Sequence, residues 1–188
     1  RRQRQMCIRD SNWTSCFQGS AWELDEKTNE YYLHLFSKKQ PDLNWQNPKV
    51  RQECIDIMNY WVDKGVDGFR LDVINLISKD ESQYYVDSTI KGHEVCANGP
   101  HIHEYIQEMN QKVFSRKELL TVGETPAVTI EDAKKYAPLD NKELSMVFQF
   151  ELMNVDGAEV NKWTDQRFSF CSGQSHCHHG HGMFQVLL

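Results

Sequence analysis

Apolar residues along the middle of this chain recur with a period that alternates between that of a helix and that of a buried strand. Asn47 is a good helix N-cap and Pro48 suits the first helical position, so we predict a helix that starts at Pro48. Gly65 is expected to end this helix, and a strand over residues 66–72 is expected to follow at once. The predicted buried face of the helix consists of Val50, Cys54, Ile57, Met58, Trp61 and Val62.

The same alternation continues downstream. A second helix is predicted to start at Pro100, and a strand over residues 119–122 follows it after a short polar turn. Thr129 and Asp132 resemble a capping box for a third, short helix that the next proline ends, and a strand over 144–150 comes after it. The apolar face of the second helix is made of Ile102, Tyr105, Ile106, Met109 and Val113. This order of strands and helices predicts an α/β fold with parallel strands.

Two of the predicted strands end on a carboxylate. One ends Gly68-Phe69-Arg70-Leu71-Asp72, and the other ends Val122-Gly123-Glu124. In barrels of repeating strand–helix units, the C-terminal ends of the strands converge on the catalytic face. Two carboxylates there suggest glycoside hydrolysis, in which one acid attacks the sugar and the other protonates the leaving oxygen. Arg70 and Asp72 are two residues apart on a strand, so a buried ion pair is the alternative interpretation.

The composition is that of a mildly acidic protein that suits a neutral ligand. The chain has 188 residues, a net charge of −6 and 26% charged residues, and it lacks a basic stripe that would recruit nucleic acid. Its apolar runs are shorter than the roughly 18 residues that span a membrane, and no signal peptide is visible. A complete eightfold barrel needs about 250 residues, so the barrel interpretation makes this chain a fragment.

Six cysteines are scattered along the chain without the spacing of a zinc or redox motif. We interpret them as the thiols of a reduced, cytoplasmic protein, and Cys54 as a core residue of its helix. Residues 1–11 match the translation of a transposon-type sequencing adapter, so we exclude them from the fold.

The last part of the chain, residues 168–188, forms an aberrant tail. It holds His176, Cys177, His178, His179 and His181, a cluster that could bind a metal ion. A frameshifted end is the interpretation that we favour for this composition. We expect both ends, residues 1–11 and 168–188, to pack poorly against the rest of the protein.

Three blocks, in this order, resemble signature blocks of the alpha-amylase family, glycoside hydrolase family 13, in its oligo-1,6-glucosidase and alpha-glucosidase branch. They are Gln-Pro-Asp-Leu-Asn at 40–44, Gly-Val-Asp-Gly-Phe-Arg-Leu-Asp-Val-Ile-Asn at 65–75 and Val-Gly-Glu-Thr-Pro at 122–126. The resemblance runs from about residue 12 to about residue 168 and implies part of a (β/α)8 TIM barrel. It implies that residues 12–45 are the end of an inserted small domain and that 46–167 are the central part of the catalytic barrel.

The resemblance also implies roles for single residues. In the family, the aspartate matching Asp72 is the nucleophile and the glutamate matching Glu124 is the general acid and base. Arg70, on the same strand face, would favour the ionised form of Asp72. Val73 matches a position that tends to be valine in enzymes preferring α-1,6 bonds and threonine in those preferring α-1,4 bonds. We therefore assign Arg70 and Val73 to substrate binding and predict retaining hydrolysis of α-1,6-linked gluco-oligosaccharides.

Other blocks of the family are absent from this sequence. They are the early histidine-containing block, the later His-Asp block with the third carboxylate, and the calcium site in the first loop of some relatives. We assign no metal and no cofactor, and we expect the chain as written to be inactive. The expected partner is a small oligosaccharide bound by a monomer, with no nucleic-acid and no membrane partner.

Three alternative functions remain. A trehalose-6-phosphate hydrolase has a similar nucleophile block, but its later block more typically runs Gly-Glu-Met-Ser-Ser, whereas this chain has Gly123-Glu124-Thr125-Pro126-Ala127. A non-catalytic barrel, such as the heavy chain of an amino-acid transporter, would have lost the two acids that are present here. A sucrose-isomerising transglucosylase is the third, since hydrolysis and transfer differ mainly in the acceptor that attacks the intermediate.

Overall fold

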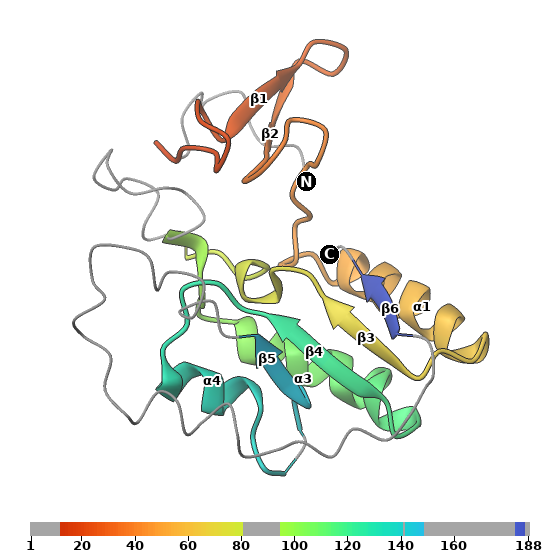
Figure 1. Cartoon of the computed structure of the whole chain (residues 1–188). Coiled ribbons are helices and arrows are strands. Elements are labelled where there is room, and N and C mark those ends of the chain that lie inside the picture. Colours follow the sequence, from red (N-terminus) through yellow and green to blue (C-terminus); the bar gives the residue numbers. More distant parts are fainter. Residues whose placement is uncertain (1–11, 81–94, 141, 149–182, 187–188) are drawn as a thin grey trace.

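Among the residues that the structure describes, four parallel strands and three helices form the main body of the protein. Figure 1 shows the computed structural model, which describes residues 12–80, 95–140, 142–148 and 183–186. The sheet has the order β5-β4-β3-β6, and each neighbouring pair is parallel. The strands are β3 (Gly68–Leu71), β4 (Leu120–Glu124), β5 (Met146–Phe148) and β6 (Met183–Val186). The helices α1 (Pro48–Asp63), α3 (Ile102–Lys112) and α4 (Ile130–Tyr136) lie on one face of this sheet (Figure 1). The predicted α/β fold with parallel strands is confirmed.

Local sequence signals fix both ends of α1. The Asn47 side chain accepts a hydrogen bond from the Lys49 amide at 3.1 Å, and Pro48 occupies the first helical position, as predicted. After the helix, Gly65 has a φ of 96°, a left-handed conformation that glycine adopts without steric cost.

The buried face of α1 differs from the prediction at one side. Its buried residues are Cys54, Ile55, Met58 and Val62. Cys54 is a core residue, as predicted, but Ile57 is 55% exposed and the prediction for it is wrong. Cys54, Met58 and Val62 form the centre of the buried face, and Ile55 extends this face to one side. Ile57 lies on the other side of the helix surface and faces solvent.

The other two helices follow their sequence patterns. In α3 and just after it, every residue of the predicted apolar face is at most 7% exposed. Thr129 caps α4, because its hydroxyl accepts a hydrogen bond from the Asp132 amide at 3.1 Å. A short 3-10 turn, η3 (Phe114–Arg116), links α3 to β4. None of the described helices is long and apolar enough to cross a membrane.

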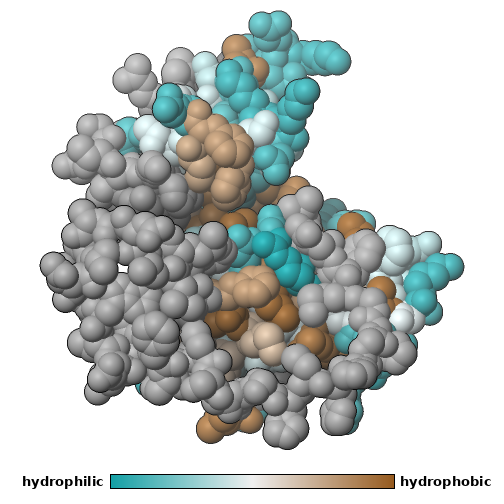
Figure 2. All heavy atoms as spheres, viewed as in Figure 1, coloured by the Kyte–Doolittle hydropathy of each residue, from teal (hydrophilic) through white to brown (hydrophobic). Residues whose placement is uncertain are grey.

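The two faces of the sheet have different surroundings. Phe69 and Leu71 of β3 are fully buried in the main hydrophobic core, beside residues of α1 and α3. Side chains alternate along a strand, so Arg70 lies on the opposite face. That face also carries exposed apolar side chains, with Leu120 41% and Phe148 45% exposed. Figure 2 shows hydrophobic side chains gathered near the centre of this view.

The segment from 12 to 45 contains an antiparallel hairpin that we did not predict from the sequence. Its strands are β1 (Trp22–Asp25) and β2 (Glu30–Leu33), and Asn29 before β2 has a left-handed φ of 55°. The hairpin lies above the sheet in Figure 1. A second, smaller core lies beneath it and is formed by Trp13, Ala21, Leu35, Leu76 and Cys96. Some of the aromatic residues of this segment thus form a satellite core, while Phe17 is 68% exposed.

One end of the chain departs from our expectation. Residues 183–186 form β6, which pairs in parallel with β3 in the register Gly68 to Met183. The prediction that residues 168–188 pack poorly is therefore wrong for the backbone of these residues. Without β6 this side of β3 would expose unpaired backbone groups, and an added strand satisfies them. Residues 1–11, 168–182 and 187–188 lie outside the described residues.

Candidate active site

Asp72 and Glu124 lie at the same edge of the sheet. Strands β3 and β4 are parallel neighbours, paired from Gly68 with Leu120 to Leu71 with Gly123. Asp72 directly follows β3, and Glu124 is the last residue of β4. Paired residues of adjacent strands point to the same face, so the two carboxylates share the face that carries Arg70. The structure brings together the two acids that the sequence pattern singled out.

Arg70 joins the two acids. Its Nη1 atom pairs with Oδ1 of Asp72, and its Nη2 atom pairs with Oε2 of Glu124. The side chains of Arg70, Asp72 and Glu124 are 22%, 23% and 17% exposed. The ion pair considered as the alternative does exist, but it extends to a second carboxylate and stays open to solvent. A ligand at this edge of the sheet can therefore reach both acids.

Val73 adopts a strained backbone immediately after Asp72. Its φ is 38° and its ψ is 42°, which is the left-handed region and rare for a β-branched residue. The predicted strand over residues 66–72 ends at Leu71 in the structure, so Val73 lies in the turn that follows β3. The left-handed turn directs the Val73 amide to Oε2 of Glu124 at 3.3 Å. Such a conformation costs about 1–3 kcal/mol, which the surrounding contacts must offset.

A buried polar residue beneath the acids was missed in the sequence analysis. Asn75 is 0% exposed and belongs to η1 (Ile74–Leu76), the short 3-10 turn after Asp72. Its Nδ2 atom donates to the Pro126 carbonyl at 2.7 Å, in the loop that follows Glu124. The available sequence signal was a lone amide in the apolar run Val73-Ile74-Asn75-Leu76-Ile77. A buried polar side chain in such a run needs a hydrogen-bond partner.

The segment that resembles the first signature block contacts the loop after β3. Asp42, in the block at 40–44, forms an ion pair with Lys79, and their side chains are 19% and 15% exposed. Asp42 also donates its amide to the Leu33 carbonyl of β2 at 2.8 Å. The hairpin segment is in this way tied to the chain that continues from Asp72.

The cysteines of the described residues are thiols. Cys16, Cys54 and Cys96 form no disulfide, which agrees with the prediction for these three. Burial raises the pKa of Cys96 to about 12, and burial also raises the pKa of Cys54. Both therefore stay protonated at neutral pH and are poor nucleophiles. The remaining three cysteines lie outside the described residues.

No metal centre is visible in the part of the chain that the structure describes. No group of three or more His, Cys, Asp or Glu side chains is placed there to hold an ion. The histidine-rich segment at 176–181 lies outside that part.

Comparison with known proteins gives a consistent picture. Residues 1–181 match the alpha-amylase family in its catalytic domain. The chain is 55% identical over 157 residues to the oligo-1,6-glucosidase of Bacillus cereus, covering 81% of this chain and 28% of that protein. It is also 55% identical over 141 residues to the glucan 1,6-alpha-glucosidase of Streptococcus dysgalactiae subsp. equisimilis, covering 75% of this chain and 24% of that protein.

A solved structure supports the same relationship. The crystal structure of trehalose-6-phosphate hydrolase from Bacillus licheniformis matches with a TM-score of 0.73 and 44% identity, over 82% of this chain and 28% of that one. The described sheet and helices are thus part of a TIM barrel, as predicted. The chain spans less than a third of the length of each of these three proteins.

Proposed function

Because this chain belongs to the alpha-amylase family, we propose that its full-length protein is a retaining glycoside hydrolase that releases glucose from α-1,6-linked gluco-oligosaccharides. The observation that carries this proposal is the position of Asp72 and Glu124 on either side of the Arg70 guanidinium. Two carboxylates that flank the scissile bond are the usual catalytic groups of glycosidases. Bonds of the α-1,4 type are a second substrate class that the same site would accept.

In the proposed mechanism, Asp72 attacks the anomeric carbon while Glu124 delivers a proton to the glycosidic oxygen, so that the C–O bond breaks. The glucosyl unit is then held as an ester of Asp72. Ionised Glu124 takes a proton from a water molecule that attacks the same carbon, and Asp72 leaves as a carboxylate. Two inversions give net retention. Arg70 stabilises the negative charge of Asp72 before attack and after release.

The preference for α-1,6 bonds is supported by two features of the sequence and by the relatives. Val73 has the residue type that resembles α-1,6-preferring enzymes, and the block at 40–44 resembles the same branch. Proteins named oligo-1,6-glucosidase and glucan 1,6-alpha-glucosidase are 55% identical to this chain over the matched regions. In this proposal the Val73 side chain influences which glycosidic bond is preferred, while the Val73 amide contacts Oε2 of Glu124.

We propose the following division of the chain. Residues 1–11 derive from an adapter, 12–45 are the end of an inserted small domain, 46–167 are the central part of the barrel, and 168–188 are an aberrant tail. The hairpin with its own small core supports a separate unit before residue 46. Since the chain covers 28% of the Bacillus cereus relative, we assign the activity to the full-length protein and expect the isolated chain to be inactive.

The proposed setting is a cytoplasmic monomer whose partner is a small oligosaccharide, without nucleic acid and without a membrane. Three free thiols among the described residues support a reducing compartment. The net charge of −6 supports a neutral substrate rather than a polyanion.

A side-by-side assay of the full-length protein tests this function. We expect isomaltose to be cleaved with a kcat/KM at least about tenfold above that for maltose, the scale of one or two changed contacts at the bond. Trehalose-6-phosphate is the third substrate. Selective cleavage of the phosphorylated sugar would assign a trehalose-6-phosphate hydrolase instead, and a folded protein that cleaves none of the three would be a non-catalytic barrel.

A further inference from the structure

We propose that Asn75 is a positioning residue, which holds the loop of Glu124 in register with the turn of Asp72 and so aligns the two acids. The proposal rests on the proposed function, because it concerns the same pair of carboxylates. The hydrogen bonds of the Asn75 side chain go to Asn98 and Pro126 and to neither acid. Asn75 acts through the backbone segments that carry the acids.

Three left-handed residues surround Asn75. Val73 has a φ of 38°, and Asn98 and Ala127 each have a φ of 58°. Val73 follows Asp72, Ala127 lies in the loop after Glu124, and Asn98 accepts a hydrogen bond from the Asn75 side chain. Left-handed backbone is unfavourable for residues with a Cβ atom and persists where the surroundings enforce it. Both loops that carry the acids therefore need a specific restraint.

Asn75 supplies that restraint through hydrogen bonds to two other segments of the chain. Its Nδ2 atom donates to the Pro126 carbonyl at 2.7 Å and to Oδ1 of Asn98 at 3.3 Å. Its own carbonyl accepts the Asn98 amide at 2.9 Å. A main-chain carbonyl can only accept, so the Pro126 contact fixes which atom of the Asn75 carboxamide is the nitrogen.

The far side of this network is equally fixed. The Tyr136 hydroxyl donates to Oδ1 of Asn98 at 2.7 Å, and the Tyr136 side chain is 0% exposed in the core. Burial raises the pKa of Tyr136, so its hydroxyl remains a donor. Tyr136 ends α4, the helix that follows the Glu124 loop. The loop is thus held near its start through Pro126 and beyond its end through Tyr136.

The consequence reaches the site through Val73. The Val73 amide contacts Oε2 of Glu124 at 3.3 Å, and its carbonyl accepts the Leu76 amide at 2.9 Å across Asn75. A shift of the Pro126 loop relative to η1 would move Glu124 away from this amide. Misplacement of a catalytic group by about 1 Å can lower the rate by about 100-fold.

The test is the variant Asn75→Leu in the full-length protein, which keeps the branched shape and the number of heavy atoms of the side chain and removes its donor. We expect kcat for isomaltose to fall about 100-fold with KM little changed. For α-glucosyl fluoride, whose fluoride leaves without a proton, kcat/KM should fall less than about tenfold. A matched control is Asn110→Leu, which removes a 2.7 Å hydrogen bond to the Glu143 carbonyl before β5, at the other edge of the sheet. That variant should keep both activities.

Equal losses on both substrates in Asn75→Leu, or an unchanged kcat for isomaltose, would overturn the proposal. If Asn75→Leu does not fold, Tyr136→Phe takes its place. In this variant kcat for isomaltose should fall about threefold more than kcat/KM for α-glucosyl fluoride. A Tyr136→Phe variant with equal or no losses would overturn the proposal as well.

The outcome for the proposed function is separate. A wild-type protein that cleaves neither isomaltose nor α-glucosyl fluoride refutes the proposed α-1,6-glucosidase function. The positioning role is then decided by crystal structures of the wild type and Tyr136→Phe. A longer distance between the Val73 amide and Oε2 of Glu124 in the variant supports it, and an unchanged distance overturns it.

Discussion

Arg70 pairs with Asp72 and Glu124, yet the two acids should respond differently to substitution. We predict that Asp72→Asn abolishes turnover of every glucoside, because no nucleophile remains. Glu124→Gln should lower kcat/KM for isomaltose by about 100- to 10,000-fold, since the leaving oxygen is no longer protonated. The same variant should largely spare kcat/KM for α-glucosyl fluoride, which reports only the first step.

Steady-state kinetics on the two substrates check this contrast. Equal losses on isomaltose and the fluoride in Glu124→Gln would show that Glu124 is not the general acid. Residual turnover by Asp72→Asn near the wild-type rate would remove Asp72 from the mechanism.

At the residue scale, the sequence predicted that Asp72 and Glu124 lie together at the ends of strands, but it did not predict the backbone geometry around them. Asp72 and Glu124 each end an apolar run, and parallel strands bring such ends together. The left-handed turn at Val73 could not be predicted, because valine in an apolar run is typical of a strand. Nor does the sequence reveal the partner of Asn75, since Pro126 lies 51 residues away and meets it only in the folded protein.

At the element scale, helix caps were the most predictable features. Asn47 caps α1 and Thr129 caps α4, because a side-chain oxygen near the first free amides stabilises a helix locally. The hairpin β1–β2 was missed, since its strands, Trp22–Asp25 and Glu30–Leu33, are short and carry charged residues. Pairing in the hairpin depends on the small core beneath it, which a local pattern does not contain.

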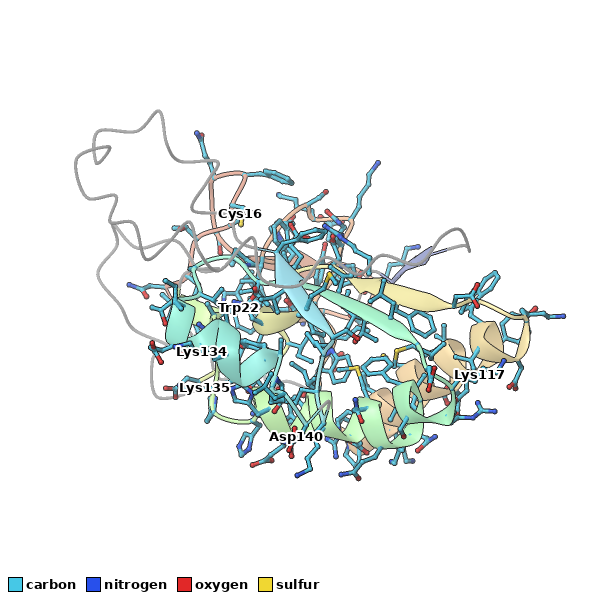
Figure 3. All side chains as sticks on the ribbon, turned by 60° about the horizontal axis from the view of Figure 1, so that its bottom comes forward. Cys16, Trp22, Lys117, Lys134, Lys135 and Asp140 are labelled. Atoms are coloured by element: carbon cyan, nitrogen blue, oxygen red, sulfur yellow. The ribbon has the colours of Figure 1, made fainter. Side chains whose placement is uncertain are left out.

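The cap of α4 should respond to pH. Hydrogen bonds from Thr129, the larger cause, and from Lys135 lower the pKa of Asp132 below 3.8. Lys134 and Lys135 lie on the outer side of this helix (Figure 3). A lowered pKa in the folded state means that stabilisation is present above pH 3.8 and is lost as the pH falls through the folded value. We predict that Thr129→Ala destabilises the protein by about 1 kcal/mol at neutral pH and by less in acid.

Denaturant unfolding at about pH 7 and about pH 3 measures this difference. Asn47→Ala is the matched control, because α1 has no acidic residue in its first turn and the cost of losing its cap should not depend on an acid there. If the free-energy change for Thr129→Ala stayed constant while the pH was lowered, Asp132 would have no part in the cap.

At the scale of the whole molecule, the helices of the described residues cover one face of the sheet (Figure 1). The other face carries Arg70 and exposed apolar side chains such as Leu120, Met146 and Phe148. In a closed barrel this face is the interior, where side chains from the strands pack in layers. The alternating pattern of strands and helices predicted the α/β fold with parallel strands, and the resemblance to the alpha-amylase family implied the barrel. The pairing of β6 with β3 was not predicted, since it satisfies an open strand edge rather than any local sequence signal.

The most direct test of the account is to trap the covalent intermediate. The full-length protein is treated with 5-fluoro-α-glucosyl fluoride, digested and mapped by mass spectrometry. We predict one added fluoroglucosyl group, esterified to Asp72, in a protein that loses activity as the label appears. A label on Glu124, or inactivation without any ester on Asp72, would contradict the assignment of Asp72 as the nucleophile of a retaining glycosidase.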